Sequence, residues 1–224
     1  MKRISILFEN EQCLVLNKPA GLAVQGGAGV GASLDKLLEE ERSPKPLLVH
    51  RLDKDTSGLI LVAKNREAAA LFSALFSQSR GICKHYLAVC EGRPPKEAGA
   101  IDFSLAIGRE LKRAQTSYRR LAGDRDSSLL ALELGTGRMH QIRRHLARIG
   151  NPLLGDDKYG NFALNKALRK SRGLNKLLLH AARLVIPPSE GLLGFSLDVS
   201  APVPGYFQDF IERFQPSGGR SLRA

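Results

Sequence analysis

Short apolar runs separated by turn residues predict the strands of this chain. Residues 4–8 and 13–17 are apolar runs on either side of ENEQ, a pattern typical of a β-hairpin. Further strands are predicted at 59–64, at 85–91 and at 128–134, where SLLALEL follows the two-residue period. The runs LLLHAARLVI (177–186) and GFSLDVS (194–200) predict two more.

Helical periodicity and capping residues predict helices between these strands. Ser33 can cap a helix that runs to about Glu41, and Asn65 can cap a second one. HQIRRHLARIG (140–150) predicts a third helix that ends at Gly150, and a fourth is expected near 206–214. The apolar residues of the second helix recur at helical spacing and make its buried face: Leu71, Phe72, Leu75 and Phe76.

This order of elements predicts a mixed α/β chain of the α+β class. A length of 224 residues with 43% hydrophobic residues is sufficient to bury a core. No internal repeat and no change in composition marks a domain boundary. We therefore expect one domain over residues 1–215, followed by a disordered tail over 216–224.

The charge of the chain favours a polyanionic partner. It has 34 Lys and Arg against 22 Asp and Glu, a formal charge of +12 and a pI of about 10.0. Nucleic acid is the first candidate, although basic proteins also occur for reasons of solubility. With no signal peptide and no membrane span, we expect a cytoplasmic protein. Its three cysteines form no C-x-x-C pair and are expected to be reduced thiols.

Familiar catalytic and ligand motifs are absent from the sequence. GGAGVGAS (26–33) lacks both the G-K-[ST] of a P-loop and the G-x-G-x-x-G spacing, which favours a flexible loop. No G-x-S-x-G elbow accompanies His50, Asp53 and Ser57, so a hydrolase triad is unsupported. The histidines do not form a ligand cluster such as H-E-x-x-H. We therefore expect no metal site.

Three polar segments beside apolar elements are candidates for chemistry. In HRLDKDTSG (50–58), Asp53 stands directly before a predicted buried strand, although both of its aspartates could simply be turn residues. In KHYLAV (84–89), Lys84 and Tyr86 lie on one face of a strand, a common place for a tyrosine.

The third segment is TGRMHQIRRHLARIG (136–150). Intervals of 100° put Met139, Ile142, Leu146 and Ile149 in one apolar stripe, with Arg143 at its border and Arg144 facing outward. A border arginine can lay its stem along the core and aim its guanidinium into a cleft. Arg143 is therefore a better partner for the Asp53 carboxylate than Arg144 is.

These segments together resemble one known family. HRLDKDTSGLILVAK, the K-x-Y of KHYLAV and GRMHQIRRHLARIGNPLLGDDKYG stand in the order found in RluA-type pseudouridine synthases. NKPAGLAVQ near the start and LLLHAARL near residue 180 are also similar to this family. The resemblance extends from about Ile4 to Phe214, and its last part is most similar to the branch that modifies large-subunit ribosomal RNA.

The resemblance implies a catalytic domain with a bent, mainly antiparallel mixed sheet flanked by helices and loops. It implies an isomerase that detaches an RNA uracil, turns it and rejoins it to the ribose through carbon, without metal or cofactor. Asp53 matches the catalytic aspartate, Tyr86 the tyrosine that stacks on the base, and Arg143 the arginine that pairs with the aspartate. Direct attack by Asp53 on a carbon and removal of a sugar proton both stay open.

Substrate contacts are expected from cations near these residues. We expect Arg51, Arg138 and His50 to bind the RNA, with the basic runs at 109–113 and 166–172, although such runs can also be merely solvated. Many members begin with a small RNA-binding module, whereas this sequence begins at the catalytic motifs, so loops should choose the substrate. We rank ribosomal RNA first and transfer RNA second, and we expect a monomer that binds neither membrane nor DNA.

Two other functional classes remain open. One is a non-catalytic RNA-binding or ribosome-assembly protein that keeps the fold, against which the presence of Asp53, Tyr86 and Arg143 argues. The other is an RNA-processing hydrolase, for which the sequence lacks a metal cluster or a nucleophile triad.

Overall fold

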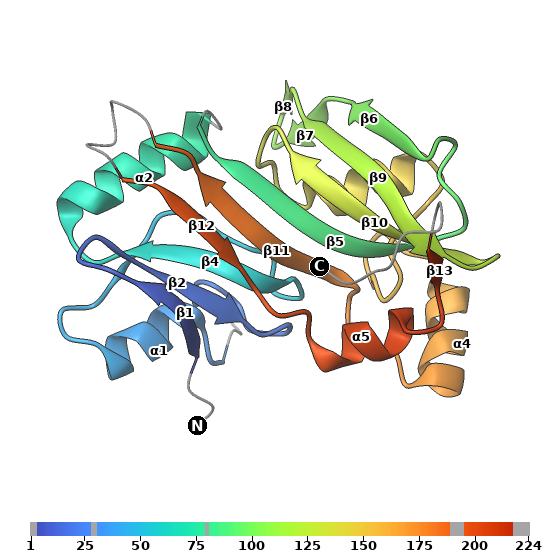
Figure 1. The fold of residues 1–224 in the computed structure, drawn as a ribbon, viewed down its shortest axis with the longest axis horizontal. Coiled ribbons are helices and arrows are strands. Elements are labelled where there is room, and N and C mark those ends of the chain that lie inside the picture. The colour runs from blue at the N-terminus through green and yellow to red at the C-terminus, as the bar shows by residue number, and fades with distance from the viewer. Residues whose placement is uncertain (1–3, 28–30, 79–80, 189–194, 217–224) are drawn as a thin grey trace. The chain divides into compact units, whose positions relative to one another are not determined.

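The computed structural model describes residues 4–27, 31–78, 81–188 and 195–216 (Figure 1). Its contacts group into two compact units. Unit 1 comprises residues 1–84 and 181–202, and unit 2 comprises 85–180 and 203–224. The predicted single domain over 1–215 stays a prediction, and the tail after 216 lies outside the described residues. Every helix in the described ranges is too short or too polar to cross a membrane.

Unit 1 contains antiparallel strand pairs that pack between two helices. β1 (Ser5–Glu9) pairs with β2 (Cys13–Lys18), which pairs with β4 (Ser57–Ala63). The short strand β3 (Leu47–Leu48) also pairs with β4. A further pair is formed by β11 (Leu179–Ile186) and β12 (Leu197–Ser200). The predicted hairpin at the start of the chain is confirmed.

Two helices of unit 1 explain why residues 59–63 of β4 are all apolar. Leu59 and Leu61 pack with Phe72 of α2 (Arg66–Gln78), whereas Ile60 and Val62 pack with the buried leucines of α1 (Leu34–Glu41). Both faces of the strand are therefore covered, as for a strand at the centre of a sheet. Figure 1 shows the two helices beside this sheet.

Both predicted helix caps of unit 1 are confirmed. The Ser33 hydroxyl accepts the Lys36 N–H at 3.4 Å, and the Asn65 side chain accepts the Ala68 N–H at 2.8 Å. Each cap satisfies one backbone donor that the first turn of a helix leaves without a partner.

Unit 2 also contains antiparallel strand pairs, with an apolar cluster on each face. β5 (Cys83–Glu91) pairs with β10 (Ser127–Leu134), and β10 pairs with β9 (Gln115–Gly123). β6 (Ala98–Asp102) and β13 (Gln215–Pro216) both pair with β9, and β7 (Leu105–Ile107) forms a separate hairpin with β8 (Glu110–Lys112).

The described residues of unit 2 form three helices. α3 (Gln141–Arg148) buries Ile142 and Leu146 against one face of the sheet, and α5 (Gly205–Ile211) buries Phe207 and Phe210 in the core of the other face. α4 (Phe162–Arg172) occupies the segment that the sequence marked only as basic, and Asn161 caps it. Antiparallel strand pairs covered by helices confirm the predicted α+β class.

One predicted core residue is exposed. Met139 was expected in the apolar stripe of α3, but the helix begins at Gln141 and the Met139 side chain is 53% exposed. The helical wheel fails here because His140, the residue before the helix, has a left-handed backbone with φ of 52°. This turn takes Met139 out of the helical period.

Candidate active site

Asp53 lies in a turn between β3 and β4 of unit 1. Its carbonyl accepts the Thr56 N–H at 3.2 Å, which confirms the predicted turn, and its side chain is half-buried. Strand β4 begins directly afterwards with Ser57 and Gly58. Gly58 has φ of +107°, and a Cβ there would lie 2.2 Å from the Ala181 carbonyl oxygen, so only glycine fits.

Lys18 contacts this turn through its ammonium group, a role that was not predicted from the sequence. Its Nζ donates to the carbonyl oxygens of Lys54 at 2.9 Å, Leu22 at 2.9 Å and Pro19 at 3.1 Å. Its side chain is fully buried, and this desolvation lowers the pKa of Lys18 to about 8, against the opposing charges of Asp55 and Asp53. The only signal in the sequence was its place in NKPAGLAVQ.

His50 serves the structure of the same segment. Its Nε2 accepts the Leu61 N–H at 2.9 Å, and its ring stacks on Phe76 with centroids 3.8 Å apart. Desolvation, with a smaller effect of the Lys84 charge, lowers the pKa of His50 to about 3. The neutral ring therefore connects the segment before Asp53 to β4, while its predicted contact with RNA stays a prediction.

The low pKa of His50 predicts acid sensitivity. In the unfolded chain this histidine gains a proton near pH 6.5, but in the folded chain only near pH 3. Stability should therefore fall by up to roughly 1.4 kcal/mol per pH unit as the pH drops below about 6. Denaturant unfolding between pH 4.5 and 6.5 measures this slope.

His50→Gln should flatten that slope, and His85→Gln, which changes a half-buried histidine of β5, should leave it unchanged. The same slope in wild type and His50→Gln would contradict a neutral, hydrogen-bonded His50.

Tyr86 is a residue of β5 in unit 2. It stands opposite Leu132 of β10 and packs, half-buried, against the core that contains Ile142 and Leu146 of α3. Its stacking on a uracil base stays a prediction. Of the other predicted RNA contacts, Arg51 is exposed in unit 1, and Arg138 of unit 2 donates from Nε to the Arg113 carbonyl at 3.2 Å.

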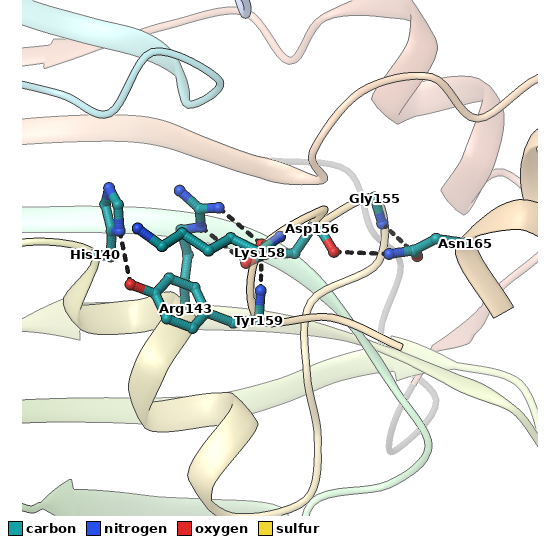
Figure 2. A network of polar contacts seen from close by, with 7 residues as sticks. All are labelled: His140, Arg143, Gly155, Asp156, Lys158, Tyr159 and Asn165. Atoms are coloured by element: carbon teal, nitrogen blue, oxygen red, sulfur yellow. Dashed lines mark hydrogen bonds and ion pairs between the residues drawn. The ribbon is translucent and has the colours of Figure 1, made fainter. Parts of the chain in front are cut away.

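Arg143 is a buried cation of α3 with a buried partner. Its Nε and Nη2 donate to the two carboxylate oxygens of Asp156 at 2.8 and 2.7 Å (Figure 2). The Arg143 side chain is 5% exposed and that of Asp156 is 0% exposed. The role of Asp156 was not predicted from the sequence, because its partner is 13 residues away in the chain.

The pair keeps Asp156 ionised. Burial by itself raises the pKa of Asp156, but the hydrogen bonds from Arg143, Tyr159 and Lys158 outweigh it, and the pKa lies below its ordinary value. The predicted pairing of Arg143 with Asp53 stays a prediction, since Asp53 belongs to unit 1 and Arg143 to unit 2.

Comparison with known proteins identifies the family. Residues 12–148 match the model of the RNA pseudouridylate synthase family, which includes Asp53, Tyr86 and Arg143. The chain belongs to the RNA pseudouridylate synthase family. This membership confirms the prediction of an RNA pseudouridine synthase, an isomerase.

Curated relatives match the sequence of this synthase over most of its length. It is 34% identical to the ribosomal large subunit pseudouridine synthase C of Rickettsia felis, over 92% of this chain and 70% of that protein. It is 38% identical to the ribosomal large subunit pseudouridine synthase D of Zymomonas mobilis, over 90% of this chain and 69% of that protein.

Solved structures of the same kind support the fold of this synthase. The human RNA pseudouridylate synthase domain containing 4 protein is similar with a TM-score of 0.77 and 26% identity, over 94% of this chain and 93% of that one. The human protein named RNA pseudouridylate synthase domain containing 1 is similar with a TM-score of 0.76 and 26% identity, over 98% of this chain and 91% of that one.

Proposed function

We propose that this synthase isomerises uridine in large-subunit ribosomal RNA, with Asp53 as its catalytic residue. The observation that carries the substrate is the similarity to relatives named ribosomal large subunit pseudouridine synthase, which extends over 90% or more of the chain. Asp53 is supported by its H-R-L-D motif and by the turn that precedes β4. Transfer RNA is the second candidate substrate.

Three side chains divide the chemical work in this proposal. Asp53 supplies the carboxylate that the reaction needs, whether it attacks a carbon of the nucleoside or removes a proton from the sugar. Both routes require the ionised form, so a cation such as Arg143 would favour the reactive state. The aromatic ring of Tyr86 offers a surface on which the uracil can stack while its bond to the ribose is broken and remade through carbon.

The charge of the protein supplies the binding energy in this proposal. Extraction of a nucleotide from folded RNA costs a few kcal/mol, which phosphate contacts and stacking must offset. The formal charge of +12 provides cations for phosphates. Among them are Arg51 and Arg138, the basic hairpin around β8 and the exposed cations Lys166, Arg169, Lys170 and Arg172 of α4.

A reducing compartment fits this proposal. Cys13, Cys83 and Cys90 are free thiols, which is usual for cytoplasmic proteins. We propose a monomer that acts in the cytoplasm. Light scattering of the purified chain, with and without RNA, would measure its oligomeric state.

The test is incubation of the purified protein with ribosomal and transfer RNA transcripts in the presence of a chelator. Pseudouridine is mapped by primer-extension stops that depend on carbodiimide treatment, and we expect new stops in the large-subunit transcript. Stops in transfer RNA alone would favour the second substrate. Bound RNA without any stop would favour a binding protein, and shortened RNA would favour a hydrolase.

A further inference from the structure

The loop after α3 presents a carboxylate to Arg143. Asp156 has no exposed side-chain surface, and its two oxygens accept Nε and Nη2 of the guanidinium in a fork-like, two-bond arrangement. Two parallel bonds fix the plane of a guanidinium, whereas one bond would leave it free to rotate. Asp156 therefore determines the orientation of the Arg143 side chain.

The Asp156 carboxylate is itself held by the backbone of its loop. Oδ1 also accepts the backbone N–H groups of Lys158 at 2.9 Å and Tyr159 at 3.0 Å (Figure 2). These two bonds fix the position of Oδ1 independently of its bond to Arg143. The loop thus offers a preformed site for one cation.

Asn165 of α4 anchors this loop from the other side. Its side-chain oxygen accepts the Gly155 N–H at 2.9 Å, and its side-chain nitrogen donates to the Asp156 carbonyl at 2.8 Å. Gly155 has φ of +76°, and a Cβ there would lie 2.1 Å from the Lys176 carbonyl oxygen. A loop packed this closely cannot shift without breaking several contacts.

Tyr159 adds a third contact to the same cation. The Arg143 guanidinium lies over its ring, 5.3 Å from the centroid, and its hydroxyl is 3.0 Å from Nδ1 of His140. His140 is the non-glycine residue with positive φ in the described part of the chain, directly before α3. The loop therefore contacts both the start of α3 and the arginine one turn further on.

We propose that Asp156 is a positioning residue for pseudouridine formation, which sets the orientation of Arg143 toward the reacting nucleotide. Asn165 fixes the backbone of the loop Gly155–Tyr159. The Asp156 carboxylate in this loop thereby fixes the orientation of the guanidinium. The inference rests on the proposed function, in which Arg143 assists the Asp53 carboxylate. Asp156 itself acts through Arg143 and through no contact with the RNA.

Asp156→Asn tests this role with little change in shape. The asparagine oxygen can still accept the N–H groups of Lys158 and Tyr159, but its amide nitrogen would face Nε of Arg143, a donor against a donor. We expect kcat to fall by about 10- to 100-fold, as for a misplaced catalytic group, while KM for the RNA is unchanged. Asp198→Asn, which alters the exposed pair with Arg183, should change neither.

A double-mutant cycle separates positioning from general loosening of the fold. The effects of Arg143→Lys and Asp156→Asn on kcat should not be additive: the double variant should have about the kcat of the less active single variant. Losses that multiply would overturn the proposal, as would an unchanged kcat in a folded Asp156→Asn.

A measurement without substrate distinguishes this proposal from the proposed function. The Arg143 Nε–H should give a slowly exchanging proton–nitrogen NMR signal, assigned by its loss in Arg143→Lys and lost also in Asp156→Asn. A persisting signal in Asp156→Asn would overturn the positioning role even if the wild type proved inactive on every RNA. An inactive wild type with the expected signals would instead refute the proposed function.

A milder variant decides the question if Asp156→Asn does not fold. Asn165→Ala leaves the carboxylate and Arg143 in place but removes both bonds that hold the loop. We expect a lower kcat with the same KM, and a wild-type kcat would overturn the proposal.

Discussion

Asp53→Asn is expected to abolish pseudouridine formation while the RNA still binds. An amide of the same size cannot act as a base or as an anionic nucleophile, so the rate should fall by at least about 100-fold. Affinity should change by no more than about twofold, because phosphate contacts dominate binding to RNA. Quantification of pseudouridine in single-turnover reactions and filter binding at fixed salt measure the two effects.

Asp55→Asn is the matched control for this change. Asp55 lies two residues further along the same turn and is also half-buried, so its loss changes the charge of the turn equally. It should keep most of the activity. Turnover by Asp53→Asn, or equal losses in both variants, would remove Asp53 from its catalytic role.

Arg143→Ala is expected to reduce both stability and activity. It leaves the fully buried Asp156 carboxylate without its cation, and breaking a buried pair in this way costs about 3–5 kcal/mol. Pseudouridine formation should be lost as well, because the variant lacks the cation proposed to assist Asp53. Urea unfolding gives the free energy of unfolding, and the transcript assay gives the activity.

Arg183→Ala provides the comparison for an exposed pair. Arg183 binds Asp198 with two hydrogen bonds, but both side chains are about half exposed, at 51% and 53%. Water screens such pairs, so this variant should lose no more than about 1 kcal/mol and keep its activity. If Arg143→Ala were as stable and as active as Arg183→Ala, the buried pair would have neither role.

Local signals predicted much of the fold. Ser33 and Asn65 cap their helices as expected, because a cap depends on residues only three positions away. The apolar run 59–63 of β4 also predicted a strand locally, since both faces of this part of the strand are buried. In α3, however, the left-handed turn at His140 depends on its surroundings, and the helical wheel misplaced Met139.

The sequence motifs name candidate site residues, whose roles stay predictions, but they do not name the residues that support them. Asp53, Tyr86 and Arg143 stand in motifs that identify the family, and the family model covers all three. Lys18 and Asp156 were missed because their roles arise from contacts made only in the folded chain. Lys18 binds the carbonyl of Lys54, 36 residues away, and neither composition nor periodicity carries that information.

The burial of Lys18 couples the turn that carries Asp53 to the proton concentration. Unfolding brings this ammonium group into water and returns its pKa from about 8 to 10.5. The unfolded chain therefore binds an additional proton between these two pH values. The contribution of Lys18 to stability should thus rise as the pH increases from about 8 to 10.5.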